Sequence, residues 1–320
     1  MQDTTAPAQP TLRAAGFWRR VGAFVIDGVF LGIVGMVLGM VMFDTLARWG
    51  VYARVIGFAI SLAYFGVLNS RITGGQTLGK ILLGIRTQRL DGTFLSLPRS
   101  FARYVVLGVP WFLNGAPLPM EALAAPWVFV ESLLIFGVLF SIVYLFVFNR
   151  STRRSLHDYA VGSWVVPASA PRDPVTLPRL WRGHVVVVGL LVAAALAAPV
   201  AANQLMSMPL WARLLPAYNA VAATPGVQHA GVQDVSAWSN GVESHYLFVV
   251  AQLENDEVLK DKRFAKRLAG AAIQASPALA ERDYVRVVLS YGYDLGIASQ
   301  WRNYEFRFDP AKLAEPSSAH

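Results

Sequence analysis

The sequence predicts a membrane α-helical bundle of about four spans plus a fifth, followed by a small α+β domain with an antiparallel sheet. Hydrophobic residues make up 55% of the 320-residue chain and charged residues only 15%, which is too apolar for an ordinary soluble protein. The apolar residues stand in long unbroken runs, as membrane spans require. Residues 1–205 contain 17 Lys and Arg against 8 Asp and Glu, whereas residues 206–320 contain 11 against 12.

Four apolar runs have the length of membrane-spanning helices. They are residues 21–43, 51–69, 127–148 and 185–205. A fifth stretch, residues 104–118, includes Pro110 and alone reaches only about 22 Å. Arginine-rich blocks stand on either side of it, at residues 71–103 and 150–182. If this stretch crosses the bilayer, both blocks lie in the cytoplasm, as the positive-inside rule favours. We therefore expect five spans, with the N-terminus inside and the C-terminus outside.

The predicted spans divide the chain into five segments. They are a disordered cytoplasmic tail at 1–16, a transmembrane domain at 17–166, a cytoplasmic linker at 167–184, a fifth transmembrane helix at 185–205 and a periplasmic α+β domain at 206–320. In the last segment, residues 284–294 alternate between apolar and polar, and residues 297–308 return after a turn as a second strand. Residues 227–238 and 244–253 are further strand candidates, and a helix begins near Asn255-Asp256 and ends at Pro277.

Asp27 is the least expected residue of the first span. It lies seven residues after Arg20, so about 10 Å into the hydrocarbon if Arg20 marks the interface. A carboxylate at that depth is costly and must be paired, protonated or turned to a polar interior. The sequence offers four candidate cationic partners, which are Lys80, Arg86, Arg103 and His157. A structural ion pair and a role in proton or ion handling both stay open.

Two further features of the spans suggest structural roles. Glycines at positions 28 and 32, and at 35 and 39, form small-xxx-small pairs that would let another helix approach closely. Glu131 and Arg54 both lie near the predicted outer face and are candidates for an ion pair. Between the second and third runs, residues 81–89 have the pattern of an amphipathic helix on the bilayer surface.

Three motifs resemble those of the RDD family of bacterial membrane proteins, over residues 17–166. The first is an Arg, an Ala three residues later and an Asp seven residues later, met by Arg20, Ala23 and Asp27. The second is the glycine-rich segment GGQTLGKILLGIR, and the third is RRSLHDYAVGSWVV after the last family helix. The residues that carry the second and third motifs are Gly74, Gly75, Gln76, Thr77, Gly79, Lys80, Gly84, Arg86, His157, Asp158 and Gly162.

The resemblance implies a multi-pass protein of the bacterial inner membrane, in a family for which transport is often proposed. It assigns Arg20, Asp27 and Asp158 to the charged motif of the family, where ion or proton handling is the candidate role. It assigns Gly75, Thr77, Gly79 and Lys80 to a glycine-rich turn. We expect Lys80 to meet lipid phosphates or Asp158.

The sequence gives little support for nucleotide binding, catalysis, metal binding or nucleic-acid binding. Gly79-Lys80 ends a stretch like a phosphate-binding loop, but Ile81 stands where Ser or Thr must hold magnesium. His157 and Asp158 are adjacent, which does not suit a catalytic triad, so we expect no enzyme. The five scattered histidines lack metal-ligand spacing, and the chain has no cysteine. We expect no cofactor or metal, and no nucleic acid partner, because the basic excess follows the membrane half.

Two functions remain open. The chain transports a small ion or solute with proton coupling through Asp27, or it is a non-transporting scaffold or sensor whose periplasmic domain binds a partner protein. The first explains the acid inside the span, and the second explains why a soluble domain follows the bundle. The expected partners are the lipid bilayer, anionic lipid headgroups, a second copy of the chain and a periplasmic protein.

Overall fold

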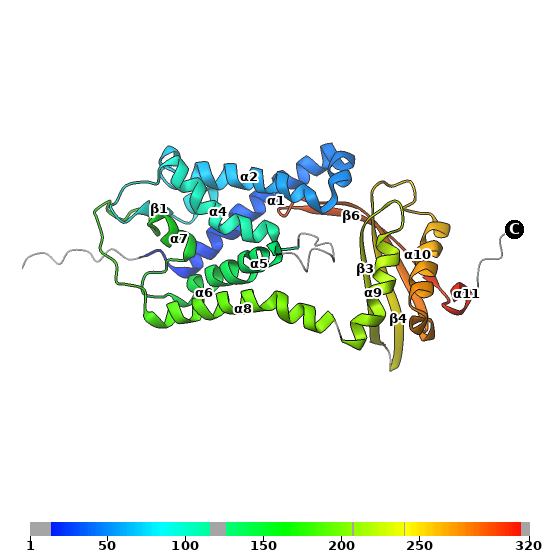
Figure 1. The fold of residues 1–320 in the computed structure, drawn as a ribbon. Helices are drawn as coiled ribbons and strands as arrows, with labels where there is room; N and C mark the ends of the chain where they lie inside the picture. Colours follow the sequence, from blue (N-terminus) through cyan, green and yellow to red (C-terminus); the bar gives the residue numbers. More distant parts are fainter. Residues whose placement is uncertain (1–13, 116–125, 207, 240, 315–320) are drawn as a thin grey trace, which may run out of the picture. The chain divides into compact units, whose positions relative to one another are not determined.

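The computed structural model describes residues 14–115, 126–206, 208–239 and 241–314, which form two compact units (Figure 1). Described residues of Met1–Gly32, Phe58–Gly115 and Phe129–Ala197 form the first, here called the helical unit. Those of Ile33–Gly57, Ala116–Val128 and Ala198–His320 form the second, the sheet unit. Most of the predicted tail at 1–16 and the end of the predicted stretch 104–118 lie outside the described residues.

Apolar helices dominate the helical unit. The helices of the membrane half are α1 (Phe17–Trp49), α2 (Arg54–Leu68), α3 (Leu78–Leu82), α4 (Leu97–Leu113), α5 (Trp127–Ser132), a π-helical stretch (Leu133–Leu139), α6 (Phe140–Phe148), α7 (Leu156–Val161) and α8 (Arg182–Met206). Three stretches of the described chain are long and apolar enough to cross a membrane: Phe17–Leu68, Trp127–Phe148 and Arg182–Leu205. The first contains both α1 and α2. Helix α4 has 17 residues, with Pro110 inside it, and the count of five spans stays a prediction.

A two-stranded ribbon takes the place of the predicted surface helix at 81–89. Helix α3 ends at Leu82, and β1 (Ile85–Arg89) then pairs antiparallel with β2 (Ser163–Pro167). The helix prediction was wrong: residues 85–89 are extended and pair with β2, and Ile85 and Thr87, two residues apart, are both fully buried, as on one face of a strand. This ribbon brings the second and third motifs together.

The sheet unit contains four strands in the order β3-β4-β5-β6. They are β3 (Val227–Ser239), β4 (Val242–Leu253), β5 (Tyr284–Asp294) and β6 (Ser299–Phe308). The β5–β6 hairpin is antiparallel, as predicted, and so is the β3–β4 pair, but β4 and β5 are parallel. The predicted antiparallel sheet is therefore a mixed one. The connection from β4 to β5 contains a helix, α10 (Lys262–Ala275), and such a crossover joins parallel strands.

Two helices pack on the sheet. Helix α9 (Pro209–Ala222), which the sequence did not reveal, and α10 contribute Ala217, Val221 and Leu268 to one core with Leu247 and Leu289 of the sheet. All five side chains are fully buried. Figure 1 shows both helices beside the strands. Short helical turns at Pro277–Glu281 and Ala311–Ala314 complete the described part of this unit.

The C-terminal end of α1 and the N-terminal end of α2 belong to the sheet unit. Phe43 of α1 packs edge-on against the rings of Tyr291 and Tyr293, with centroids 6.0 and 5.8 Å apart. Arg54 pairs with Asp294 at 2.8 Å, a partner that the sequence did not suggest. Residues 35 and 39 are glycines at which an added Cβ would lie 2.8 Å from Ala298 and 1.6 Å from the Tyr293 hydroxyl. These glycines therefore admit the β5–β6 hairpin, and not another helix.

Candidate functional site

The carboxylate of Asp27 is 1% exposed and accepts three hydrogen bonds from neutral groups. One oxygen accepts from the hydroxyl of Tyr64 at 2.7 Å and from the backbone N–H of Gly79 at 2.8 Å. The other accepts from the hydroxyl of Thr77 at 2.6 Å. Thr77 is the N-cap of α3, so Asp27 lies where helical N–H groups favour an anion. The predicted cationic partner of Asp27 is wrong: the direct contacts are a phenol, an alcohol and an amide.

The glycine-rich motif forms the turn that delivers these donors. Gly74 and Gly75 have φ of 67° and 74°, a left-handed conformation that glycine adopts readily. A Cβ at position 75 would lie 2.1 Å from the carbonyl oxygen of Thr87. A Cβ on Gly79 would lie 2.1 Å from the carbonyl oxygen of Ala23, so glycine is what allows α3 to approach α1.

Lys80 lies inward and is partly buried. Its ammonium donates to Asn69 Oδ1 and to Thr87 Oγ1, the latter at 2.6 Å. Burial, followed by the repulsion of Arg103, lowers the pKa of Lys80 well below its usual value. Asp158 was the suggested carboxylate partner, and that suggestion was wrong because the direct contacts of Lys80 are uncharged.

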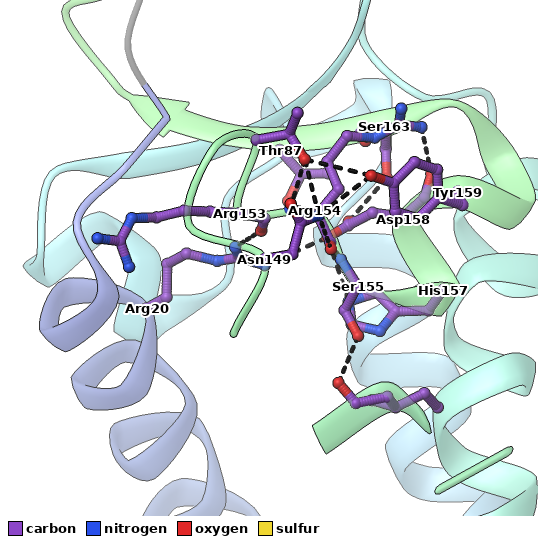
Figure 2. A network of polar contacts seen from close by, with 12 residues as sticks. Arg20, Thr87, Asn149, Arg153, Arg154, Ser155, His157, Asp158, Tyr159 and Ser163 are labelled. Atoms are coloured by element: carbon purple, nitrogen blue, oxygen red, sulfur yellow. Dashed lines mark hydrogen bonds and ion pairs between the residues drawn. The ribbon is translucent and has the colours of Figure 1, made fainter. Parts of the chain in front are cut away.

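Asp158 holds together a buried cluster of charges (Figure 2). Its oxygens lie 2.7 Å from Arg103 Nη2 and 3.2 Å from Arg20 Nη2. The hydroxyl of Ser163 donates to it at 3.0 Å and the backbone N–H of Ser155 at 3.3 Å, the latter within a capping box that starts α7. The structure thus brings Arg20 and Asp158 of the predicted charged motif into direct contact. One carboxylate ties α1, α4, α7 and β2 together.

Charge and burial act against each other at this cluster. Burial alone would raise the pKa of Asp158, but the nearby Arg103 lowers it well below its usual range. Burial lowers the pKa of His157 to about 3, despite the attraction of Asp158, so His157 is neutral at pH 7. Figure 2 also shows Arg154 beside Tyr159, and its guanidinium lies 4.1 Å from the centre of that ring.

A cavity of about 300 Å³ lies inside the helical unit. Its polar lining includes Asp27, Lys80, Arg20, Arg103 and His157. The three sequence motifs therefore meet at one internal space, although they are far apart in the chain. Most of the remaining lining is apolar. A mostly apolar pocket with a few converging polar groups is the usual form of a small-molecule site.

These features define a membrane protein whose helical unit contains a polar cluster and a cavity. The model of the RDD family matches residues 14–162, so this part of the chain is similar to that family. The chain is similar to YckC of Bacillus subtilis strain 168, a protein described as uncharacterized, with 25% identity over 157 residues that cover 49% of this chain and 87% of YckC. No solved structure matches the chain.

Sequence reasoning missed the neutral members of the site. Tyr64 lies near the C-terminal end of α2 and Asn69 follows that helix directly; a tyrosine and an asparagine among apolar residues were the available signal. Thr87 was read as part of a surface helix and is a strand residue at the Lys80 ammonium. Their roles depend on how the turn after α2 folds back, which residue spacing does not reveal.

Proposed function

We propose that the helical unit transports a small ion or solute across the bacterial inner membrane by way of the cavity. The observation that carries the proposal is the cavity itself, where Asp27, Lys80 and Arg103 meet between apolar helices. Ionisable side chains inside a membrane domain are costly and often mark the path of a substrate or a proton. If these positions served only to pack the helices, apolar side chains would stabilise the bundle equally well.

Asp27 is the proposed site of proton coupling. It is the acidic side chain among the described residues that line the cavity. All three of its contacts are hydrogen bonds that it accepts, so a proton on either oxygen would compete with a donor. Two of these donors, Thr77 and Gly79, belong to the start of α3. A proton at Asp27 would thus weaken the contact between α1 and α3, which is one way to couple protonation to opening of the cavity.

The test is proton movement through the purified full-length chain in liposomes that contain a pH-sensitive dye. Gradients of sodium chloride, potassium chloride and sodium acetate are imposed in turn. We expect the wild type to move protons under at least one gradient. The Asp27→Asn variant should remain folded and lose this flux, because the amide cannot carry the proton.

A matched control removes an acid away from the cavity. Asp91 is exposed and pairs with Arg89 at 2.6 Å, so Asp91→Asn should transport like the wild type. Folding of each variant is checked by size-exclusion chromatography and by its melting temperature. Wild-type flux in folded Asp27→Asn would reject proton coupling there, and a wild type inactive under all three gradients would reject transport.

The sheet unit favours a second candidate function, a scaffold or sensor whose periplasmic domain binds a protein partner. Tyr246 and Tyr284 stack at 4.8 Å on the sheet face opposite α9 and α10, and Phe248 beside them is half-buried. Aromatic side chains of this kind are enriched in protein interfaces. A photo-crosslinking residue at position 246 should give a discrete adduct in cells. A photo-crosslinking residue in place of exposed Lys266 on α10 should give no adduct. Absence of an adduct from both positions would reject the protein partner.

A further inference from the structure

The positive charges at the cavity outnumber the carboxylates that face them. Arg20 and Arg103 share the carboxylate of Asp158, while both oxygens of Asp27 are occupied by neutral donors. Lys80 pairs with no carboxylate among the residues that the structure describes. Three cationic side chains thus stand against two acids, and a single positive charge is left uncompensated.

Lys80 is where this charge is available to a ligand. An ammonium has three N–H donors, and Asn69 and Thr87 accept two of them. Lys80 lines the cavity, so its third donor remains for a group inside it. An anion in the cavity would provide the carboxylate or phosphate that this lysine lacks, and would oppose the effect of burial on its charge.

The rest of the cavity favours an apolar ligand body. Its walls include Phe65, Leu107 and Ile142, which offer no hydrogen bonds from their side chains. Phe24 and Val143 also line it and are 50% and 53% exposed. The cavity therefore reaches the apolar outer surface of the helices, so an apolar chain could enter from the side.

We propose that this cavity binds an amphipathic anion, with a carboxylate or phosphate head on Lys80 and a short apolar chain between α1, α2, α4 and α6. The proposal rests on the proposed transport function, because it names the class of solute that the cavity would carry. Arg20 and Arg103 lie on the same lining and add favourable potential for the head group. Asp27 disfavours a second negative charge, so the ligand is a monoanion.

Binding is tested by the melting temperature of the full chain in phosphatidylcholine nanodiscs. The soluble probe is decanoate, and decanol and decyltrimethylammonium share its chain with no charge or a positive one. A second set of nanodiscs contains phosphatidylglycerol, which separates a bilayer lipid from a soluble amphiphile as the source of the head group. We expect decanoate or phosphatidylglycerol to raise the melting temperature by several degrees, and decanol and the cation to have no such effect.

The Lys80 variants decide whether the head group binds there. Lys80→Gln should abolish the rise in melting temperature that the anion causes. Without ligand, this variant should be at least as stable as the wild type, because an unpaired charge is removed from a partly buried site. Lys80→Arg should retain the rise. Arg89→Gln, which removes a cation half-exposed on β1, should behave like the wild type.

Three outcomes would overturn this inference: equal stabilisation by the cationic probe, no stabilisation by either anion, or an unchanged rise in Lys80→Gln. A Lys80→Gln protein that fails to fold would also overturn it, because the lysine would then be structural. The proposed function fails separately. Anion binding without flux leaves a binding site in a protein that does not transport, and flux without anion binding leaves a transporter of another solute.

Discussion

Asp158 contributes more to the helical unit than its single charge suggests. It accepts from Arg20, Arg103 and Ser163 and is completely buried. Removing one partner of such a cluster leaves the others buried and unpaired, which typically costs about 3–5 kcal/mol. Asp27 is linked to its neighbours by three neutral donors. The two acids of the charged motif therefore have different chemistry. Of the two, Asp158 forms ion pairs with described residues and Asp27 does not.

His157 predicts a pH dependence of stability. Its pKa is lowered by burial to about 3, below the unfolded value of 6.5, so below pH 6.5 the unfolded chain binds a proton that the folded chain does not. Stability is therefore fully present above pH 6.5 and falls as the pH decreases towards 3. At pH 4.5 the loss should be about 2–3 kcal/mol. The measurement is thermal unfolding of the full chain in detergent from pH 7.5 to 4.5.

His157→Gln should show a flatter stability profile over this pH range than the wild type. His245 is about half-exposed on the sheet unit, and His245→Gln serves as the control with an unchanged profile. Parallel profiles for wild type and His157→Gln would contradict the prediction.

The sequence located the charged residues of the site but not their pairings. Arg20 and Asp158 were assigned to the charged motif by the family resemblance, and the two are in contact. Arg103 was proposed as a partner of Asp27 and pairs with Asp158. A sequence shows which segments carry charge, whereas pairing depends on the rotation of α4 and on the β1–β2 ribbon that positions α7. Neither is encoded in the local spacing of residues.

At the scale of elements, glycines decide which segments approach closely. In the sheet unit, a Cβ at position 57 would lie 1.7 Å from the carbonyl oxygen of Leu295, in the turn between β5 and β6. Tyr293 likewise lies over Gly39. The β5–β6 hairpin therefore lies close to the backbone of both α1 and α2, and Arg54 pairs with Asp294 beside this contact. A small-residue pair that looked like a helix-packing motif serves a β-hairpin.

Gly57→Ala should destabilise the sheet unit, because the new methyl meets a backbone oxygen that cannot rotate away. We expect a loss of about 1–3 kcal/mol, as for other overpacked sites. The measurement is hydrogen exchange of the amides of β5 and β6, which should become faster. Gly28→Ala is the matched control, since a Cβ there meets nothing within 4 Å. Equal exchange in both variants would show that the turn does not rest on α2.

The sequence pattern predicted the elements with strong periodicity. It missed the elements and pairings that depend on segments distant in the sequence. The hairpin of β5 and β6 was predicted because Val285, Val287 and Leu289 alternate, and the structure confirms it. The parallel pairing of β4 with β5 depends on how α10 crosses, so alternation alone did not reveal it. The short strand β1 was read as a helix because five residues are too few to separate the two periods.

At the scale of the whole molecule, the distribution of charge predicts the topology. Both arginine-rich blocks lie inside only if residues 104–118 cross the bilayer. Alkaline phosphatase fused after residue 320 should therefore be active in a bacterial host. The same enzyme fused after residue 175, in the predicted cytoplasmic linker, should be inactive. The reverse pattern would remove one span and place the C-terminal domain in the cytoplasm.

The sheet unit does not begin where the last membrane helix ends. Phe43 and Ala47 of α1 pack with its core, and Gly57 of α2 contacts its hairpin. A chimera in which residues 206–320 alone are joined to another bundle would lack these contacts. Such a chimera would also need residues 33–57. Recombination that exchanged such domains at a single breakpoint would separate the two halves of one interior. Folding of the sheet unit is thereby tied to the ends of the first two helices.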